Sequence, residues 1–151
     1  GLREREAAYR ELGGEAGWRV LCLRAAAVVG GPVRSEIADY LDAAMPVRVA
    51  GFDPPIQVLH YSDLLDALER GVSEDVTGTL NVVGRGVVLL SRLVALCGRL
   101  AVPLPETFAR WLAPAALGPD ALKWRCVADG RRAEQVLGFH ARFSAEEALA
   151  A

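Results

Sequence analysis

Four polar residues that could take part in chemistry stand side by side in the stretch IQVLHYSDLLDAL, which runs from Ile56 to Leu68. They are His60, Tyr61, Ser62 and Asp63. The stretch begins like a strand and ends like a helix, so the cluster is either a reactive site or the cap of that helix. Ser62 is a suitable N-cap, and Asp63 places a negative charge in the first helical turn. These features account for the cluster without catalysis, and we favour the cap.

A metal site at this cluster is not expected. His60 and Asp63 offer two potential ligands, and no other histidine lies nearby in the sequence. Protein zinc sites usually need three or four protein ligands. The sequence therefore predicts no metal ligands here.

A second candidate is the glycine pair in LNVVGRGVVLLSRL. A strand, then Gly84-x-Gly86, then a helix is the layout of a dinucleotide fingerprint, and Glu106 follows about 20 residues later. The third glycine of the fingerprint is missing, because Leu89 stands there. We therefore expect a tight turn between strand and helix rather than a cofactor site.

The composition is typical of one globular domain with a sizeable core. The chain has 151 residues, of which 52% are hydrophobic and 24% are charged. Its net charge of −2 gives no electrostatic basis for binding nucleic acid or an anionic membrane. No apolar run reaches the length that spans a membrane. Three cysteines without a Cys-x-x-Cys pair favour a reduced, cytoplasmic protein.

Strands and helices are expected to alternate, which predicts the α/β class. WRVLCL (18–23) is a nearly unbroken apolar run, typical of a strand buried on both faces. Further strands are predicted at 45–51, 56–60 and 78–84. Helices are predicted at 2–12, 34–44, 63–70, 89–100 and 131–139, with another after Ser144. Residues 102–105 should be extended, 106–117 helical until Pro114, and 122–129 a strand or a loop.

Local signals fix several helix ends. Gly13 and Gly14 should stop the first helix, Ser35 should cap the second, and Gly138 should close the helix at 131–139. Leu64, Leu65 and Leu68 are expected on one apolar side of their helix. No N-cap residue precedes the first helix, which suggests that the chain starts in the middle of a larger protein.

Four segments, in order, resemble the extended short-chain dehydrogenases, the NAD-dependent epimerase/dehydratase family. IQVLH, two residues and DLLDAL resemble the family's F-I-H-V-D-D-V-A-x-A. LRAAAVVGGP resembles its L-R-P-x-x-V-Y-G-P, and GTLNVVG its x-x-Y-N-V-G. VADGRRAEQVLGF resembles x-x-D-x-S-R-A-x-x-x-L-G-W/F. The resemblance covers nearly the whole chain, but only the C-terminal half of the family's usual length.

The resemblance implies a Rossmann-like fold with half of the machinery missing. Such proteins bind the dinucleotide through an N-terminal Gly-rich domain and use a Tyr-x-x-x-Lys pair for proton chemistry. In this chain no tyrosine has a lysine four residues later, and Lys123 is the only lysine. Residues 1–151 would then be a single substrate-binding domain, with the N-terminal dinucleotide-binding domain absent. NAD or NADP is the implied cofactor, and we expect neither to bind this chain alone.

The resemblance also implies where ligands lie. The implied cofactor contacts are Ala25, Ala27 and Val28, and the implied substrate contacts are Val29, Ile56 and Gln57. Ala25 stands where the family has proline, and Val29 where it has tyrosine. Ile56 replaces an arginine that meets the phosphates of nucleotide sugars in many members. Isoleucine cannot make that charge-assisted contact, which argues against a nucleotide-sugar substrate.

Three further charged residues have a structural interpretation that must be weighed against a functional one. Arg24 ends a strand, and its guanidinium either reaches solvent or a backbone carbonyl, or has a functional role. Asp129 and Arg132 are expected to start a helix, with Asp129 near the N-cap.

Two functional hypotheses follow. In the first, the chain is the substrate-binding portion of an NAD(P)-dependent oxidoreductase that acts on a small molecule and is incomplete alone. In the second, it is a non-catalytic binding or assembly module derived from that family. The partner is a missing N-terminal domain in the first case and a second copy or another protein in the second.

Overall fold

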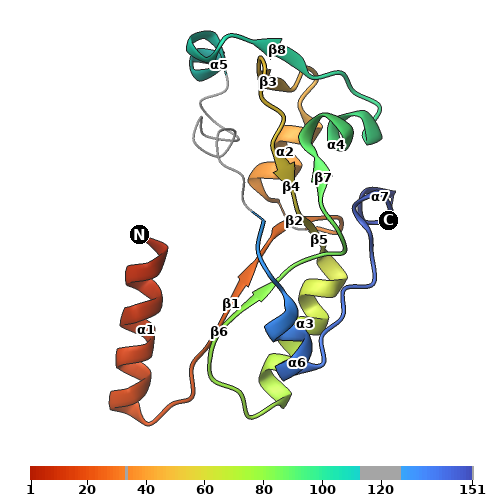
Figure 1. Ribbon diagram of the computed structural model, residues 1–151. Helices are drawn as coiled ribbons and strands as arrows, with labels where there is room; N and C mark the ends of the chain where they lie inside the picture. Colours follow the sequence, from red (N-terminus) through yellow and green to blue (C-terminus); the bar gives the residue numbers. More distant parts are fainter. Residues whose placement is uncertain (33, 113–126, 151) are drawn as a thin grey trace.

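The computed structural model describes residues 1–32, 34–112 and 127–150 (Figure 1). The strands are β1 (Leu21–Ala25), β2 (Ala27–Val29), β3 (Val47–Val49), β4 (Pro55–Ile56), β5 (Val58–His60), β6 (Gly78–Val82), β7 (Val88–Leu89) and β8 (Val102–Leu104). The helices are α1 (Leu2–Ala16), α2 (Glu36–Asp42), α3 (Tyr61–Ser73), α4 (Leu90–Leu96), α5 (Glu106–Leu112), α6 (Arg131–Leu137) and α7 (Ala145–Ala150). The predicted α/β class is confirmed.

The strands pair two by two along the length of the molecule (Figure 1). β1 runs parallel to β6, β2 to β5 and β3 to β8, while β4 and β7 are antiparallel. Only Ala26 separates β1 from β2, and its N–H donates to the Val82 carbonyl oxygen at 2.9 Å. At this residue the chain exchanges β6 for β5 as its neighbour.

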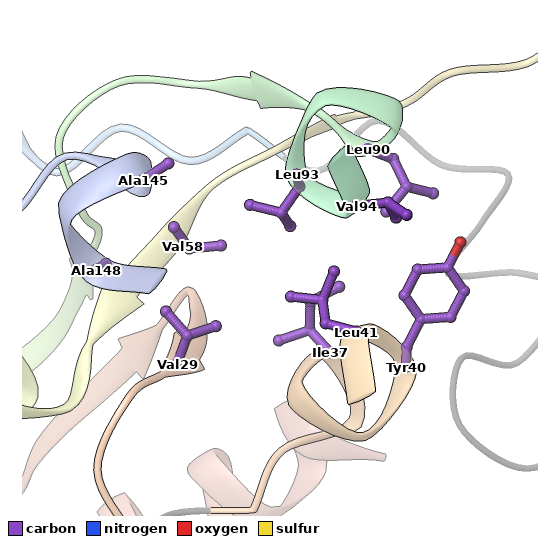
Figure 2. Close-up of a cluster of buried hydrophobic side chains, with 10 residues drawn as sticks. All are labelled: Val29, Ile37, Tyr40, Leu41, Val58, Leu90, Leu93, Val94, Ala145 and Ala148. Atoms are coloured by element: carbon purple, nitrogen blue, oxygen red, sulfur yellow. The ribbon is translucent and has the colours of Figure 1, made fainter. Parts of the chain in front are cut away.

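Two clusters of buried side chains form the core. The first lies between α2, α4 and α7 and includes Val29, Ile37, Tyr40, Leu41, Val58, Leu90, Leu93, Val94, Ala145 and Ala148 (Figure 2). The second lies between β6, α3 and α6 and consists of Leu59, Ala67, Leu80, Val82, Ala133, Leu137 and Phe139. Adjacent residues of β5, Val58 and Leu59, point into different clusters, because side chains alternate across a strand.

The first helix is longer than predicted. It continues through Gly13 and Gly14 and ends at Gly17, which has the left-handed conformation, with φ of 69°. Glycine is tolerated in a helix interior at modest cost. Gly13 is needed for packing, since a Cβ there would lie 2.3 Å from Cγ2 of Val20.

The apolar run 18–23 is not a strand buried on both faces. β1 begins only at Leu21, and Trp18 is 73% exposed. The residues of β1 are half-buried or exposed, because in the described part of the chain β6 is its only neighbouring strand. An apolar strand in this segment was predicted correctly, but the prediction that both of its faces are buried was wrong.

Helix α3 also differs from expectation. It starts at Tyr61, runs past Gly71 to Ser73, and leaves Leu65 and Leu68 exposed. Gly71 sits so close to β1 that a Cβ would lie 3.0 Å from the Leu21 side chain. The glycine therefore serves close packing rather than helix termination.

The remaining element boundaries agree only in part with the predictions. The strand predicted at 56–60 is divided between β4 and β5, and the short strands β2 and β7 were not predicted. Ser35 caps α2 by accepting the Ala38 N–H at 3.2 Å, as predicted. Gly138 closes α6 with φ of 59°, also as predicted. Pro114 and most of 122–129 fall outside the described residues.

Substitution of Gly84 tests how closely the loop after β6 packs against β5. A Cβ at this position would lie 1.8 Å from the Val58 carbonyl oxygen, so Gly84→Ala must push β5 away from the loop that follows β6. We expect the free energy of unfolding to fall by about 3 kcal/mol, measured by urea denaturation. Gly14→Ala is the matched control, since nothing lies within 4 Å of its Cβ and the helix should gain about 0.5–1 kcal/mol. Equal effects of Gly84→Ala and Gly14→Ala on the free energy of unfolding would contradict the close approach of Gly84 to β5.

Candidate functional site

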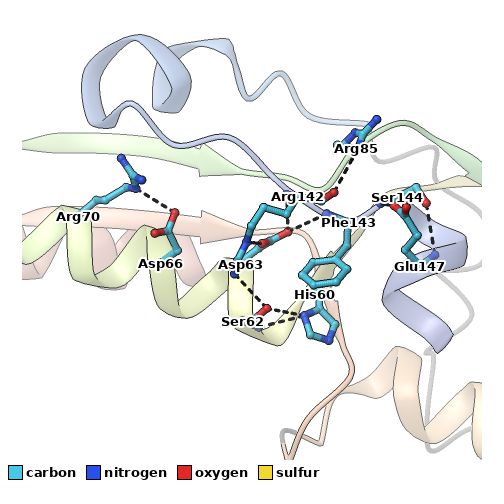
Figure 3. Close-up of polar contacts among 10 residues, drawn as sticks. All are labelled: His60, Ser62, Asp63, Asp66, Arg70, Arg85, Arg142, Phe143, Ser144 and Glu147. Atoms are coloured by element: carbon cyan, nitrogen blue, oxygen red, sulfur yellow. Dashed lines mark hydrogen bonds and ion pairs between the residues drawn. The ribbon is translucent and has the colours of Figure 1, made fainter. Parts of the chain in front are cut away.

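Asp63 is the most buried polar residue of the cluster, with no exposed surface (Figure 3). Its Oδ2 accepts the backbone N–H of Arg142 at 3.0 Å and that of Phe143 at 3.3 Å. Its Oδ1 accepts from Nε of Arg142 at 2.8 Å. A buried carboxylate is stable only when it is paired and hydrogen-bonded, and these three bonds meet that need. They tie α3 to the segment before α7.

His60, rather than Ser62, is the N-cap of α3. Its Nδ1 accepts the Ser62 N–H at 3.3 Å and lies 2.7 Å from Ser62 Oγ. Since Nδ1 accepts, a neutral His60 carries its proton on Nε2. The ring packs against Phe143 with centroids 4.3 Å apart, and Arg142 Nη2 donates to Ser62 Oγ at 3.2 Å. The predicted N-cap Ser62 is therefore wrong, and the polar cluster is a connected network (Figure 3).

The loop after β2 lies directly on this network. Gly30 and Gly31 both have positive φ, 76° and 63°, which favours glycine. A Cβ on Gly30 would lie 2.5 Å from Nε2 of His60, and one on Gly31 would lie 2.6 Å from the Tyr61 ring. The register of β2 and β5 sets Val29 beside His60. The loop that the family resemblance places near the ligands is thus brought against the polar cluster.

The six residues implied as ligand contacts lie along the β1–β2 and β4–β5 segments. Ala25 is exposed at the end of β1, whereas Val29 is only 2% exposed. Ala27 packs against the first core cluster and pairs with Val58. The Val28 carbonyl oxygen accepts from Oγ of Ser35 at 2.5 Å. Their roles stay predictions.

The other two implied contacts are already engaged. Ile56 packs against the first core cluster. Gln57 donates from Nε2 to the Ala128 carbonyl oxygen at 3.2 Å and accepts the Ala128 N–H on Oε1 at 2.7 Å. Both atoms of the amide therefore fix the segment that leads into α6.

Arg24 has a protein partner. Its Nε and Nη2 donate to the two carboxylate oxygens of Glu6 at 2.8 and 2.6 Å. These bonds lower the pKa of Glu6 and raise that of Arg24. The pair connects α1 to the end of β1, which gives Arg24 a structural role.

Asp129 lies just before α6, as predicted. Its carboxylate accepts from the Arg131 side chain and from the Arg131 N–H at 3.0 Å. These hydrogen bonds lower the pKa of Asp129 to about 2. The N-cap itself is Gly130.

The glycine turn at 84–86 does not have the layout of a dinucleotide site. It leads into the short strand β7, and only then does α4 begin. Gly84 is required by its contact with β5, and Gly86 has φ of 77°. The first turn of α4 is capped from elsewhere, since Asp53 Oδ1 accepts the Ser91 N–H at 2.9 Å.

Sequence reasoning missed the partners of Asp63. A carboxylate four residues before Ala67, on the buried side of α3, was a signal that Asp63 needs an internal partner. Nothing in the local sequence pointed to Arg142, 79 positions away. Contacts at such separation follow from the fold rather than from a motif.

Residues 1–32, 34–112 and 127–150 contain no group of three or more His, Cys, Asp or Glu side chains placed to hold a metal ion. No helix within those ranges has the length and apolar character to cross a membrane.

Sequence comparison gives relatives without an assigned role. No family model matches the chain. Over 92 residues it is 34% identical to uncharacterized proteins of Mycobacterium tuberculosis (strain H37Rv) and Mycobacterium bovis. The match covers 61% of this chain but 24% of each relative.

Solved structures resemble the fold over nearly the whole chain. UDP-glucose 4-epimerase of Thermotoga maritima, solved with UDP-glucose, gives a TM-score of 0.69 at 16% identity and covers 97% of this chain. MoeE5, solved with UDP-glucuronic acid and NAD, gives 0.66 at 24% identity over 88%. RMD of Pseudomonas aeruginosa, solved with NADPH, gives 0.64 at 16% over 95%. The chain spans 48%, 45% and 49% of these three structures. Its fold is that of about half of a Rossmann-like epimerase.

Substitution of Asp63 tests whether its hydrogen bonds hold α3 and the segment before α7 together. Asp63→Ala leaves the N–H groups of Arg142 and Phe143 without acceptors, and we expect a loss of about 1–3 kcal/mol in the free energy of unfolding. Asp66→Ala is the control on the same helix, because Asp66 pairs with the half-exposed Arg70, and should cost about 0.3–0.5 kcal/mol. Urea denaturation of both variants makes the comparison. Similar losses would show that the buried carboxylate is dispensable.

Proposed function

We propose that this chain is the substrate-binding portion of an NAD(P)-dependent, epimerase/dehydratase-like oxidoreductase of the cytoplasm. It is catalytically incomplete alone, and residues 1–151 act as one domain. The observation that carries the proposal is the unequal coverage. MoeE5 matches 88% of this chain, yet this chain accounts for 45% of MoeE5. The remaining part of such an enzyme would hold the cofactor and the proton-transfer residues.

The geometry of the β2 loop supports the same assignment. Parallel strands β2 and β5 end side by side, and ligands of open α/β sheets bind outside the carboxyl ends of the strands. Gly30 and Gly31 follow β2, and the network of His60, Ser62 and Asp63 follows β5. In this reading Ala25, Ala27 and Val28 face the cofactor supplied from the other half.

The substrate is proposed to be a small molecule without a pyrophosphate held at Ile56. An aliphatic side chain packed on the core offers no donor to a phosphate. The sugar nucleotides named for MoeE5 and the Thermotoga epimerase belong to those proteins. A substrate for this chain would rely on shape and on backbone groups beside Val29.

Titration with the cofactor tests whether the cofactor-binding site lies outside this chain. We expect calorimetric titration of the purified, folded chain with NADH and with NADPH to give no saturable heat, because the cofactor-binding part is not included. Saturable binding by the chain alone would contradict the proposal, and circular dichroism on the same sample confirms that it is folded.

Reconstitution tests the activity. The chain is co-expressed with the part of the Mycobacterium tuberculosis relative that lies outside the matched 92 residues. We expect the complex to bind NAD(P) and to reduce or oxidise it in the presence of small hydroxy or keto compounds, while the complementing polypeptide alone shows no turnover. A folded complex without cofactor-dependent turnover would favour the alternative, a non-catalytic module.

A further inference from the structure

His60 is a buried titratable side chain to which the proposed function gives no role. It is 9% exposed, and its ring packs against Phe143 (Figure 3). Its Nε2 lies so close to Gly30 that a Cβ on this glycine would be 2.5 Å away. One imidazole therefore touches three parts of the chain: the start of α3, the segment before α7 and the loop after β2.

Capping of α3 requires one protonation state of this imidazole. Nδ1 of His60 accepts the Ser62 N–H at 3.3 Å, and only an unprotonated ring nitrogen can accept a hydrogen bond. In the imidazolium both nitrogens are donors, so two N–H groups would face each other here. The Ser62 hydroxyl, 2.7 Å from Nδ1, can reverse its role, but the backbone N–H cannot. The cap is therefore present when His60 is neutral and lost when it is protonated.

A proton on Nδ1 would also face a permanent positive charge. Ser62 Oγ accepts from Nη2 of Arg142 at 3.2 Å, so a single oxygen atom separates that guanidinium from Nδ1. Asp63 is the carboxylate of this network, but its two oxygens already accept three hydrogen bonds from Arg142 and Phe143. Arg142 and Asp63 thus act on the ring with opposite signs.

The other elements around the ring bring no anion to it. Gly30 and Gly31 carry no charge, and the phenol ring of Tyr61 lies against Gly31. Glu147 of α7 accepts the Ser144 N–H at 2.7 Å. Among the described residues no carboxylate is hydrogen-bonded to the His60 ring. A charged imidazole would therefore lose its cap without gaining an ion pair.

We propose that His60 is a pH-sensitive switch for the loop after β2. The neutral ring caps α3 and supports Gly30, whereas the protonated ring releases the cap and loosens both the helix start and the loop. Histidine is the side chain whose charge ordinarily changes between pH 5 and 8. The switch itself does not depend on the proposed function. Its effect on a substrate does, because that proposal places the substrate beside this loop.

Nuclear magnetic resonance of the folded chain tests the switch. We expect the backbone order parameters of Gly30 and Gly31 to fall from about 0.85 at pH 7.5 to below about 0.6 at pH 5.5. The protection of the Ser62 N–H against hydrogen exchange, corrected for the intrinsic effect of pH, should fall about tenfold over the same range. Neither measurement needs cofactor or turnover, so this result and the fate of the proposed enzyme activity are separate.

Two matched variants identify the titrating group. Asparagine is a good N-cap that does not titrate in this range, so in His60→Asn the protection of Ser62 should change less than about twofold between the two pH values. His140→Asn is the control, because His140 is exposed and is the only other histidine of the chain. This variant should show the wild-type response.

Three outcomes would overturn the switch: no response in the wild type, a response that persists in His60→Asn, or one that disappears in His140→Asn. Circular dichroism shows whether each variant is folded. If His60→Asn does not fold, the wild type decides the question. The imidazole nitrogen signals of His60 and the protection of Ser62 must then change with the same midpoint pH, and different midpoints would overturn the proposal.

Discussion

The buried carboxylate of Asp63 is the interaction on which the rest of the site depends. It joins the first turn of α3 to the backbone at Arg142 and Phe143, which are separated from it by 79 and 80 positions in the chain. Through Phe143 the same segment packs on the His60 ring, and through Ser144 it starts α7. Without the carboxylate, two partly buried N–H groups would lack acceptors, which costs more than an exposed ion pair returns.

Steric limits determine the remaining geometry around that network. Gly84 approaches Val58, and Gly30 approaches His60, at distances that exclude a Cβ. The first contact keeps the loop after β6 against β5, and the second keeps the loop after β2 against the helix cap. Because His60 caps α3 and also lies against Gly30, the position of the loop after β2 is linked to the start of α3.

The sequence predicted what depends on local patterns. Ser35 and Gly138 act at helix ends as predicted, and Ser144 accepts the Glu147 N–H at the start of α7, since a cap needs only neighbouring backbone groups. It failed where tertiary contacts decide. The imidazole of His60, rather than the Ser62 hydroxyl, caps α3. Leu68 is exposed because nothing in the described chain covers that side of the helix. Arg142 carried no motif, so its pairing with Asp63 required the three-dimensional structure.

The implied ligand residues limit what kind of recognition this half can supply. Five of the six have aliphatic side chains, and Gln57 spends both amide atoms on the backbone of Ala128. Gln57 is therefore the only one of the six with polar side-chain atoms, and both of these atoms already bind the backbone of Ala128. Under the proposed function, selectivity would have to come from shape and from backbone groups of the loop after β2.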